Sequence, residues 1–279
     1  MNTFLLTKRG RIFLMQNLIE SYEEIDEEHR LQSSLARRVE FISTVEALTP
    51  FCFSKMKILD VGCGTGIYSL YFSKKGADVT AIDLVPKHIR RLEELINKEK
   101  LFIDSYVGNA VDLSRFDDES FDMVLCLGPL YHLISSDDRQ KCLNECIRVT
   151  KAKGIIAFAY ISPYSVFPCV LRGNLSRISK ELMKKIVDDK KISSDDSCCF
   201  WTDNYFYSPD DIEIWLKNND LIIEDHLASD GQSIAFQTVV NSMNDSEFEI
   251  WLEYHRKTCR IPSLLGASNH GLIITRKKV

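Results

Sequence analysis

Three glycines and two carboxylates are the residues whose types and spacing best suit ligand binding. The run Asp60-Val61-Gly62-Cys63-Gly64-Thr65-Gly66 follows an apolar segment, and Asp83 lies 17 residues beyond Gly66. Glycines allow a tight turn and let a ligand approach the backbone, because no Cβ stands in the way. A carboxylate at the tip of the next strand can accept hydrogen bonds from both hydroxyls of a ribose. Together these signals predict a nucleoside across the carboxyl ends of the first two strands.

The spacing of the glycines indicates which nucleoside is bound. Dinucleotide folds use G-x-G-x-x-G, in which a helix N-terminus faces a pyrophosphate. This chain has G-x-G-x-G with Asp60 just before it, and a carboxylate there would repel a pyrophosphate and suit an ammonium group. The segment resembles motif I of the class I S-adenosylmethionine-dependent methyltransferases. A nicotinamide oxidoreductase and a glycine turn without a ligand are the alternatives.

The resemblance continues from about residue 55 to residue 161. Gly108–Leu113 lies where that family carries an adenine-contacting segment, with Asn109 in place of the usual Asp, and 148–154 resembles the turn before its fifth strand. The core is similar to the small-molecule branch, including ubiquinone/menaquinone-type enzymes, and the termini to an uncharacterised bacterial subgroup. The resemblance implies S-adenosyl-L-methionine as cofactor and S-adenosyl-L-homocysteine as product. The implied cofactor-binding residues are Asp60, Gly62, Cys63, Gly64, Thr65, Gly66, Asp83, Leu84, Asn109, Ala110, Leu127, Gly128 and Tyr22.

The segment leaving the fourth strand carries the candidate catalytic residues. Methyl transfer requires above all that the acceptor atom be aligned with the methyl carbon. His132 is the candidate general base, because an imidazole with a pKa near neutrality suits that task. Tyr131 could orient the acceptor or face the cofactor's positive charge through its ring. The alternative is that both residues only pack around the cofactor.

An apparent insertion at 163–207 is expected to form a cap over the acceptor. It lacks a strand rhythm and contains several aromatic residues, which favours an apolar or planar acceptor, although aromatics also commonly seal a small cap against a core. We expect methylation of an O, N or S atom of a small molecule. A protein or peptide methyltransferase and a non-catalytic S-adenosylmethionine-binding protein are the alternatives. The expected substrate-binding residues are Arg30, Tyr131, His132, Phe167, Trp201 and Tyr205.

The elements that must position these residues follow from the hydrophobic pattern. Apolar runs alternate with amphipathic stretches, which predicts a parallel sheet covered on both faces. The fold expected is α/β: a Rossmann-like seven-stranded, mostly parallel sheet with helices on both faces and an antiparallel last strand. Residues 1–54 form a helical N-terminal extension or lid, and 55–279 form the methyltransferase domain. Strands are expected at 56–61, 78–84, 102–107, 121–127, 154–161, 221–227 and 272–276, and helices at 67–75, 86–100, 137–151, 208–219 and 246–257.

The composition narrows the partners and the compartment. The net charge of −5 argues against a nucleic-acid partner, and no apolar run reaches the roughly 18 residues that a membrane span needs. The nine cysteines include no C-x-x-C pair, which is typical of reduced cysteines in a cytoplasmic protein. The histidines have no metal-ligand spacing, so no metal is expected. We therefore expect a cytoplasmic monomer or homodimer without a membrane partner.

Overall fold

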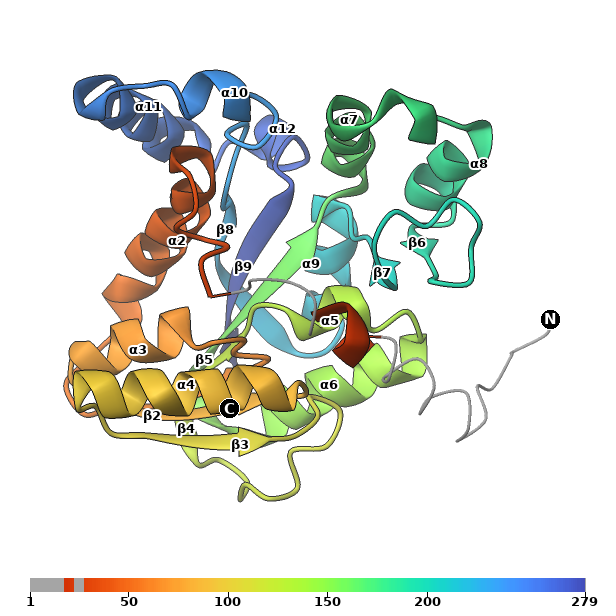
Figure 1. The fold of residues 1–279 in the computed structure, drawn as a ribbon. Coiled ribbons are helices and arrows are strands. Elements are labelled where there is room, and N and C mark those ends of the chain that lie inside the picture. The colour runs from red at the N-terminus through yellow and green to blue at the C-terminus, as the bar shows by residue number, and fades with distance from the viewer. Residues whose placement is uncertain (1–17, 23–27, 279) are drawn as a thin grey trace.

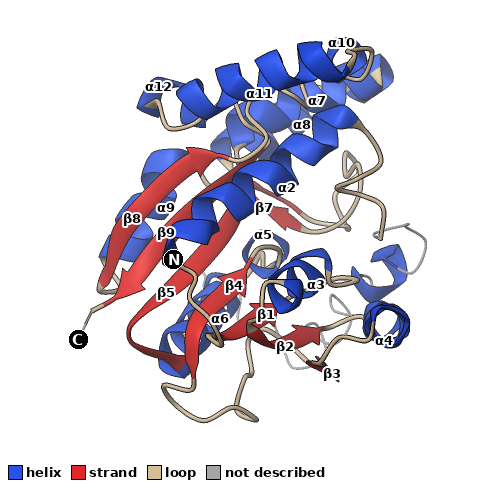
Figure 2. Cartoon of the chain, turned by 90° about the vertical axis from the view of Figure 1, so that its left-hand side faces the viewer, coloured by secondary structure: helices blue, strands red, loops and turns tan. Residues whose placement is uncertain are grey.

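The computed structural model describes residues 18–22 and 28–278. Its centre is a seven-stranded sheet with helices on both faces (Figures 1 and 2), which confirms the predicted α/β, Rossmann-like class. The strand order is β3-β2-β1-β4-β5-β9-β8. The strands are β1 (Lys57–Val61), β2 (Asp78–Asp83), β3 (Ile103–Val107), β4 (Phe121–Cys126), β5 (Thr150–Ile161), β8 (Leu221–Ala228) and β9 (His270–Lys277).

The order of the parallel strands switches at β1, with β2 and β3 on one side of it and β4 and β5 on the other. Strands β1 to β5 pair in parallel, and β9 runs antiparallel to both β5 and β8. The antiparallel last strand is thus confirmed. Strand β1 lies between β2 and β4. The loops that leave β1 and β2 therefore lie side by side at the carboxyl edge of the sheet. The chain that leaves β4 lies at the same edge, on the opposite side of β1 from β2. Open α/β sheets bind ligands in the crevice at such a switch point.

Each face of the sheet has its own apolar core and its own helices. On one face, Ile58, Met123 and Ile274 pack against α2 (Leu35–Leu48) and α3 (Ile67–Lys74), and α4 (Pro86–Glu99) covers β2 through Leu92. On the other face, α6 (Ser136–Val149) and α9 (Pro209–Lys217) bury their apolar sides against the same strands. Both faces are therefore covered, as the near-continuous apolar strands predict.

Helices and one small sheet make up residues 163–207, where a cap was expected. Its helices lie beyond the C-terminal end of β5 in Figure 1. The segment also contains a two-stranded sheet, although its sequence lacks a clear strand rhythm. This segment has its own apolar cluster, which includes Leu182, Ile186 and Phe206. The elements are α7 (Pro163–Gly173), η2 (Leu175–Arg177), α8 (Lys180–Met183), η3 (Lys184–Asp188), β6 (Lys191–Ile192) and β7 (Asn204–Tyr205).

The N-terminal part of the chain packs onto the C-terminal part. Helix α2 contacts β9, α10 (Gln237–Val240) and α11 (Asp245–Thr258), and Ala36 and Val39 share a cluster with Phe248. The short η1 (Thr49–Phe51) ends α2, and α12 (Pro262–Leu265) precedes β9. The division into an extension at 1–54, a domain at 55–279 and a cap insertion at 163–207 stays a prediction.

Strand β5 and the segment after β4 differ from the sequence expectation near the site. Strand β5 begins at Thr150 instead of residue 154, because Thr150 pairs with Phe121 before a bulge shifts the register. The segment after β4, expected as a loop, contains the four-residue helix α5 (Pro129–His132) with Pro129 at its first position. Proline is favoured at this position because the N–H group that it lacks would have no partner within the helix. Helix α5 is what brings Tyr131 and His132 to the crevice.

Candidate functional site

The glycine loop leaves β1 in a conformation that glycine favours. Gly62, Gly64 and Gly66 all have positive φ, at 72°, 56° and 86°. A Cβ on Gly62 would lie 2.7 Å from the ring of Pro129, and a Cβ on Gly66 would collide with the side chain of Leu92. Gly62 thus allows the loop to approach α5, and Gly66 allows it to pack against α4. The sequence expectation for the loop's turn is met, although Gly66 serves packing and does not line the crevice.

Asp83 organises the loop from the tip of β2. Its carboxylate accepts the backbone N–H groups of Gly64 and Val85, each at 2.8 Å, and lies 3.1 Å from Nδ1 of His88. Because the carboxylate only accepts, Nδ1 of a neutral His88 carries the proton and Nε2 is a free acceptor. That Nε2 is buried and has no hydrogen-bond partner among the residues the structure describes. A buried acceptor without a donor suits a ligand hydroxyl such as that of a ribose.

Asp60 lies in β1, two residues before Gly62, and lines the cleft. It is buried, and its carboxylate accepts the Ser69 hydroxyl at 2.6 Å. Burial, with a smaller contribution from the neighbouring Asp83, raises the pKa of Asp60 to about 7. A cationic group placed beside it would favour the ionised form and lower that pKa again. The residue therefore fits the ammonium group that the sequence assigns to it.

These residues line a cleft along the carboxyl edge of the sheet. It holds about 1050 Å³ of empty space, counting its open mouth. Every residue assigned from the sequence to the cofactor lines this cleft except Gly66. The sequence missed His88, Tyr68, Val85 and Pro129, which also line it. His88 was missed although it lies only five residues after Asp83, because its contact depends on the first turn of α4.

Asn109 is held in the cleft by its own backbone. Its side-chain Oδ1 accepts the N–H of Val111 at 3.1 Å, and residues 109 and 112 form an isolated bridge. The side-chain oxygen that the sequence assigns to adenine thus already accepts one hydrogen bond. An amide oxygen has two lone pairs and can accept a second hydrogen bond, so the assignment of Asn109 to adenine stays a prediction.

His132 lies between Tyr22 and the cap. Its Nδ1 is 3.2 Å from the carbonyl oxygen of Asp203, so Nδ1 is the donor, and its Nε2 accepts the Tyr22 hydroxyl at 2.8 Å. Burial lowers the pKa of His132 to about 4, in contrast with the near-neutral pKa expected from the sequence. The imidazole is therefore uncharged at neutral pH. Tyr131 is buried beside it and donates its hydroxyl to the Leu127 carbonyl at 3.2 Å.

A second, larger cavity adjoins the cleft on the side of the cap. It holds about 1900 Å³ of empty space with its mouth included. Tyr22, Arg30 and Tyr131 line both cavities, so they mark the junction. The Trp201 ring lies 5.4 Å from the rings of Tyr22 and His132, measured between centroids. Of the expected substrate-binding residues, Arg30, Tyr131 and Trp201 line this second cavity, and His132 lines the cleft next to it.

The other two residues expected to bind substrate lie elsewhere. Phe167 packs against the apolar cluster of the cap. Tyr205 lies under Arg139, whose guanidinium carbon is 3.5 Å from the ring centroid, and it also contacts the ring of Tyr207. Neither residue lines either cavity. Their aromatic character seals the cap, which is the alternative that the sequence left open.

An ion-pair cluster forms one wall of the second cavity, and no sequence spacing indicated it. His270 Nδ1 lies 2.9 Å from Asp230 and 3.4 Å from Glu40, and Arg30 lies 3.2 Å from Glu40. Burial acts to lower the pKa of His270, but the carboxylates of Glu40 and Asp230 outweigh it and raise that pKa. His270 is therefore cationic over a wider pH range than a free histidine.

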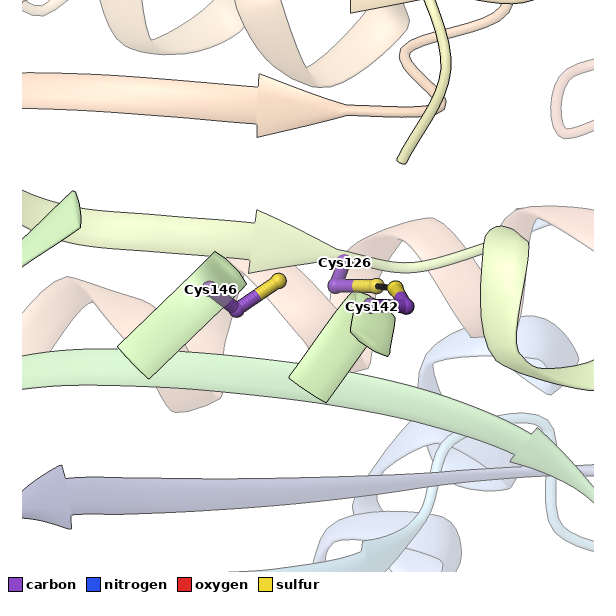
Figure 3. Close-up of side chains that lie close together, drawn as sticks. All are labelled: Cys126, Cys142 and Cys146. Atoms are coloured by element: carbon purple, nitrogen blue, oxygen red, sulfur yellow. Dashed lines mark hydrogen bonds between the residues drawn. The ribbon is translucent and has the colours of Figure 1, made fainter. Parts of the chain in front are cut away.

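Three cysteines come together away from both cavities. Cys126 at the end of β4 faces Cys142 and Cys146 on α6 (Figure 3), and the sulfur atoms of the first two lie 3.8 Å apart. All three are fully buried in the core between the sheet and α6. All nine cysteines are free thiols. The one-turn spacing of the two α6 cysteines places them on the same face of the helix, and this face packs into the core.

Comparisons with known proteins agree with this geometry. Residues 59–158 match a family model described as a methyltransferase domain. The chain is 29% identical over 183 residues to the ubiquinone biosynthesis O-methyltransferase of Pasteurella multocida, covering 58% of this chain and 74% of that protein. It is 29% identical over 171 residues to the protein of the same name from Xanthomonas oryzae pv. oryzae, covering 61% of this chain and 64%, just under two thirds, of that protein.

Solved structures show the same fold at low identity. An S-adenosylmethionine-dependent methyltransferase from Methanosarcina mazei superposes with a TM-score of 0.57 at 18% identity, covering 84% of this chain and 97% of that one. One from Clostridium acetobutylicum superposes with a TM-score of 0.55 at 14% identity, covering 97% of this chain and 99% of that one. Within the described part of the chain, no helix is both long and apolar enough to cross a bilayer.

Proposed function

We propose that this chain, a class I S-adenosylmethionine-dependent methyltransferase, methylates an oxygen atom of a small molecule that occupies the cavity beside the cap. The observation that carries the proposal is the shared wall of the two cavities. Tyr22, Arg30 and Tyr131 contribute to both, so a group bound in one cavity is adjacent to a group bound in the other. The relatives named O-methyltransferases support oxygen as the acceptor atom.

The predicted cofactor-binding residues offer a different chemical group to each part of the cofactor. When bound, S-adenosylmethionine supplies an electrophilic methyl group. Asp83 and the free Nε2 of His88 would accept hydrogen bonds from its ribose hydroxyls, and Asp60 would face its ammonium group. The backbone of the glycine loop approaches without side chains in the way. The chain thus offers acceptors and carboxylates where a nucleoside with a cationic tail needs them.

The acceptor proton has a route through Tyr22 to His132. The hydroxyl of Tyr22 donates to His132 Nε2, and Nδ1–H of His132 donates to the Asp203 carbonyl. In the proposed step the acceptor O–H proton passes to the Tyr22 oxygen while the Tyr22 proton passes to Nε2. A base whose pKa is about 4 is weak, but an oxygen that is gaining a bond to carbon releases its proton readily. The neutral imidazole is therefore available as a proton acceptor at neutral pH.

The relatives named ubiquinone biosynthesis O-methyltransferases favour a small acceptor over a peptide. Phe206 and Ile161 form part of the wall of the second cavity, and both belong to the apolar cluster that includes Leu182 and Ile186. The comparisons favour neither the protein or peptide methyltransferase nor the non-catalytic binding protein. A cytoplasmic location, and a monomer or homodimer as the oligomeric state, belong to the same proposal.

Transfer of a labelled methyl group tests the proposal. The purified chain is incubated with S-adenosylmethionine tritiated on its methyl group and with a bacterial extract, which is then separated into protein, nucleic acid and small molecules. We expect label in the small-molecule fraction, in a product whose label is stable to conditions that cleave carboxyl methyl esters. Label in the protein fraction would contradict the proposal. A parallel reaction with the Asp83→Asn variant shows whether the labelling depends on the cleft.

A further inference from the structure

We infer that the methyl acceptor carries an anionic group, a carboxylate or a phosphate, next to an apolar body, and that Arg37 and Arg177 select it. This inference rests on the proposed function, because it assigns the second cavity to the acceptor. The charged residues that line the cavity, in the described part of the chain, are all arginines, and two histidines accompany them. No Asp or Glu lines it there, although the whole chain carries 40 acidic and 35 basic residues.

Two of the cationic groups are already balanced by carboxylates behind the wall. Arg30 is paired with Glu40, and His270 with Asp230. Asp230 is fully buried and also accepts the Ser268 hydroxyl at 2.6 Å. These pairs build a rigid wall but leave little net charge. The selectivity must come from cations that lack such partners.

Arg37 and Arg177 are the two arginines of the cavity wall that form no ion pair with a carboxylate among the described residues. The guanidinium of Arg37, in the first turn of α2, forms no hydrogen bond or ion pair with any residue whose placement is described, and its charge acts only at longer range on Glu40, which Arg30 and His270 already share. Arg177, in η2 of the cap, donates to the Phe200 carbonyl at 2.9 Å and has no carboxylate partner within the described ranges. Unpaired guanidinium groups lining a concave site bind carboxylate and phosphate well, because their planar donors match those oxygens.

The other residues of the cavity wall indicate which groups the rest of the ligand carries. Asn204 lines the cavity and is 2% exposed; its Nδ2 donates to the Thr202 carbonyl, and its buried Oδ1 has no partner among the described residues. This oxygen would accept a hydrogen bond from a hydroxyl of the ligand. The apolar body would contact the apolar and aromatic side chains in the remaining wall, which include Ile161, Val166, Val170, Phe200, Trp201 and Phe206.

Binding of matched fluorinated probes tests the charge of the ligand. The full chain, loaded with S-adenosylhomocysteine, is titrated with 4-fluorobenzoate, 4-fluorophenyl phosphate and the neutral 4-fluorobenzamide, and binding is followed by fluorine NMR. We expect at least one anion to bind about tenfold more tightly than the amide, the size expected for one charge-assisted hydrogen bond. The two anionic arms distinguish a carboxylate site from a phosphate site.

Neighbouring arginines provide the control. Arg37→Gln and, separately, Arg177→Gln should lose most of the preference for the anion while binding the amide as before. Arg38→Gln removes the same charge one residue away, where the guanidinium lies over the Phe248 ring and outside the cavity, and should bind like the wild type. Equal affinity for amide and anions, no detectable anion binding, or equal losses in Arg37→Gln and Arg38→Gln would overturn the inference. Failure of S-adenosylhomocysteine to bind at all would instead overturn the proposed function.

Discussion

The hydroxyl of Tyr22 lies 2.8 Å from Nε2 of His132, although the two residues are 110 positions apart in the chain. This contact joins the helical segment at 18–22 to α5, at the junction of the two cavities. Because Nδ1 of His132 is committed to the Asp203 carbonyl, Nε2 is the nitrogen that can take up a proton. The pair is therefore the proposed exit for the acceptor's proton.

Removing either member of this pair should slow methyl transfer more than it weakens binding. We expect Tyr22→Phe and His132→Ala each to lower kcat about 100-fold, the lower end of what general-base catalysis contributes. The double variant should be no slower than the worse single variant, because both changes interrupt one route. Steady-state kinetics on the acceptor found by labelling measures this, with Tyr254→Phe on the surface of α11 as the control.

The pH profile separates catalysis from packing. Burial holds the pKa of His132 at about 4, so the imidazole stays neutral, and kcat should not fall through loss of its base form between about pH 5 and pH 8. A limb near pH 6 to 7 that disappears in His132→Ala would contradict the low pKa of this residue. In the kinetic experiment above, additive losses of kcat in the variant that combines Tyr22→Phe with His132→Ala would contradict a shared proton route.

Cofactor affinity should rise with pH through the titration of Asp60. Burial raises the pKa of this carboxyl to about 7 in the free protein, and a bound ammonium group favours the ionised form. Below that pKa the cofactor must displace a proton, so binding weakens as pH falls from about 8 to 6. Calorimetry in buffers of different ionisation enthalpy measures the proton released. Asp60→Asn should bind more weakly at pH 8 and lose the pH dependence; an unchanged wild-type profile would remove Asp60 from the ammonium site.

The thermal stability of the protein without cofactor provides a second test of the raised pKa of Asp60. The folded-state pKa of Asp60 lies above its unfolded value, so the neutral carboxyl contributes stability below the unfolded pKa, and that contribution is lost as pH rises through about 7. Above this pH a buried charge is left in place. Asp60→Asn should therefore raise Tm at pH 8 relative to the wild type and change it least near pH 4. A lower Tm for the variant at pH 8 would contradict the burial argument.

Loss of the Asp83 carboxylate should weaken cofactor binding. Asp83→Asn removes a charged acceptor that also orients Gly64 and His88. We expect a loss of about 1–3 kcal/mol in binding S-adenosylhomocysteine, typical for a hydrogen bond to a charged group. Asp78→Asn, at the exposed start of the same strand, is the matched control. Equal affinities for the two variants would exclude Asp83 from the site.

His270 should make stability depend on pH near neutrality. Burial opposes its protonation, but Glu40 and Asp230 raise its pKa above the ordinary value of a histidine. Its contribution to the free energy of unfolding is therefore full below about pH 6.5 and is lost as pH rises through the higher folded-state pKa. Thermal unfolding across this range should show a wild-type decrease in Tm that is smaller in His270→Gln, where only the contribution of Asp60 remains. His29→Gln, whose side chain is 61% exposed, should keep the wild-type slope, and a wild-type slope in His270→Gln would contradict the assignment.

The sequence patterns predicted the sheet, its covering helices and the cofactor loop because these depend on local periodicity. Apolar runs such as Met56–Val61 predict buried strands, and the loop between β1 and α3 is determined by residues within seven positions of one another. Helix α5 was not predicted, because Gly128 and Pro129 are typical of a turn and only the fold shows that Pro129 begins a helix.

The acceptor cavity could not be predicted in the same way. Its wall depends on pairs far apart in the chain: Asp230 and His270 are 40 residues apart, and Arg37 and Arg177 lie in α2 and the cap. Aromatic content alone favoured Phe167 and Tyr205 as substrate-binding residues, but both seal the cap. Which aromatic side chains face a cavity and which face a core is decided by packing, and the spacing of the residues does not encode it.

A structure with S-adenosylhomocysteine bound is the measurement that tests the central claim most directly. The quantity to determine is the position of the sulfur atom relative to the two cavities. The account predicts the adenosine between the glycine loop and Asp83, with the sulfur at the junction formed by Tyr22, Arg30 and Tyr131 and facing the second cavity. A sulfur that faces away from that cavity, or an adenosine bound outside the cleft, would contradict it.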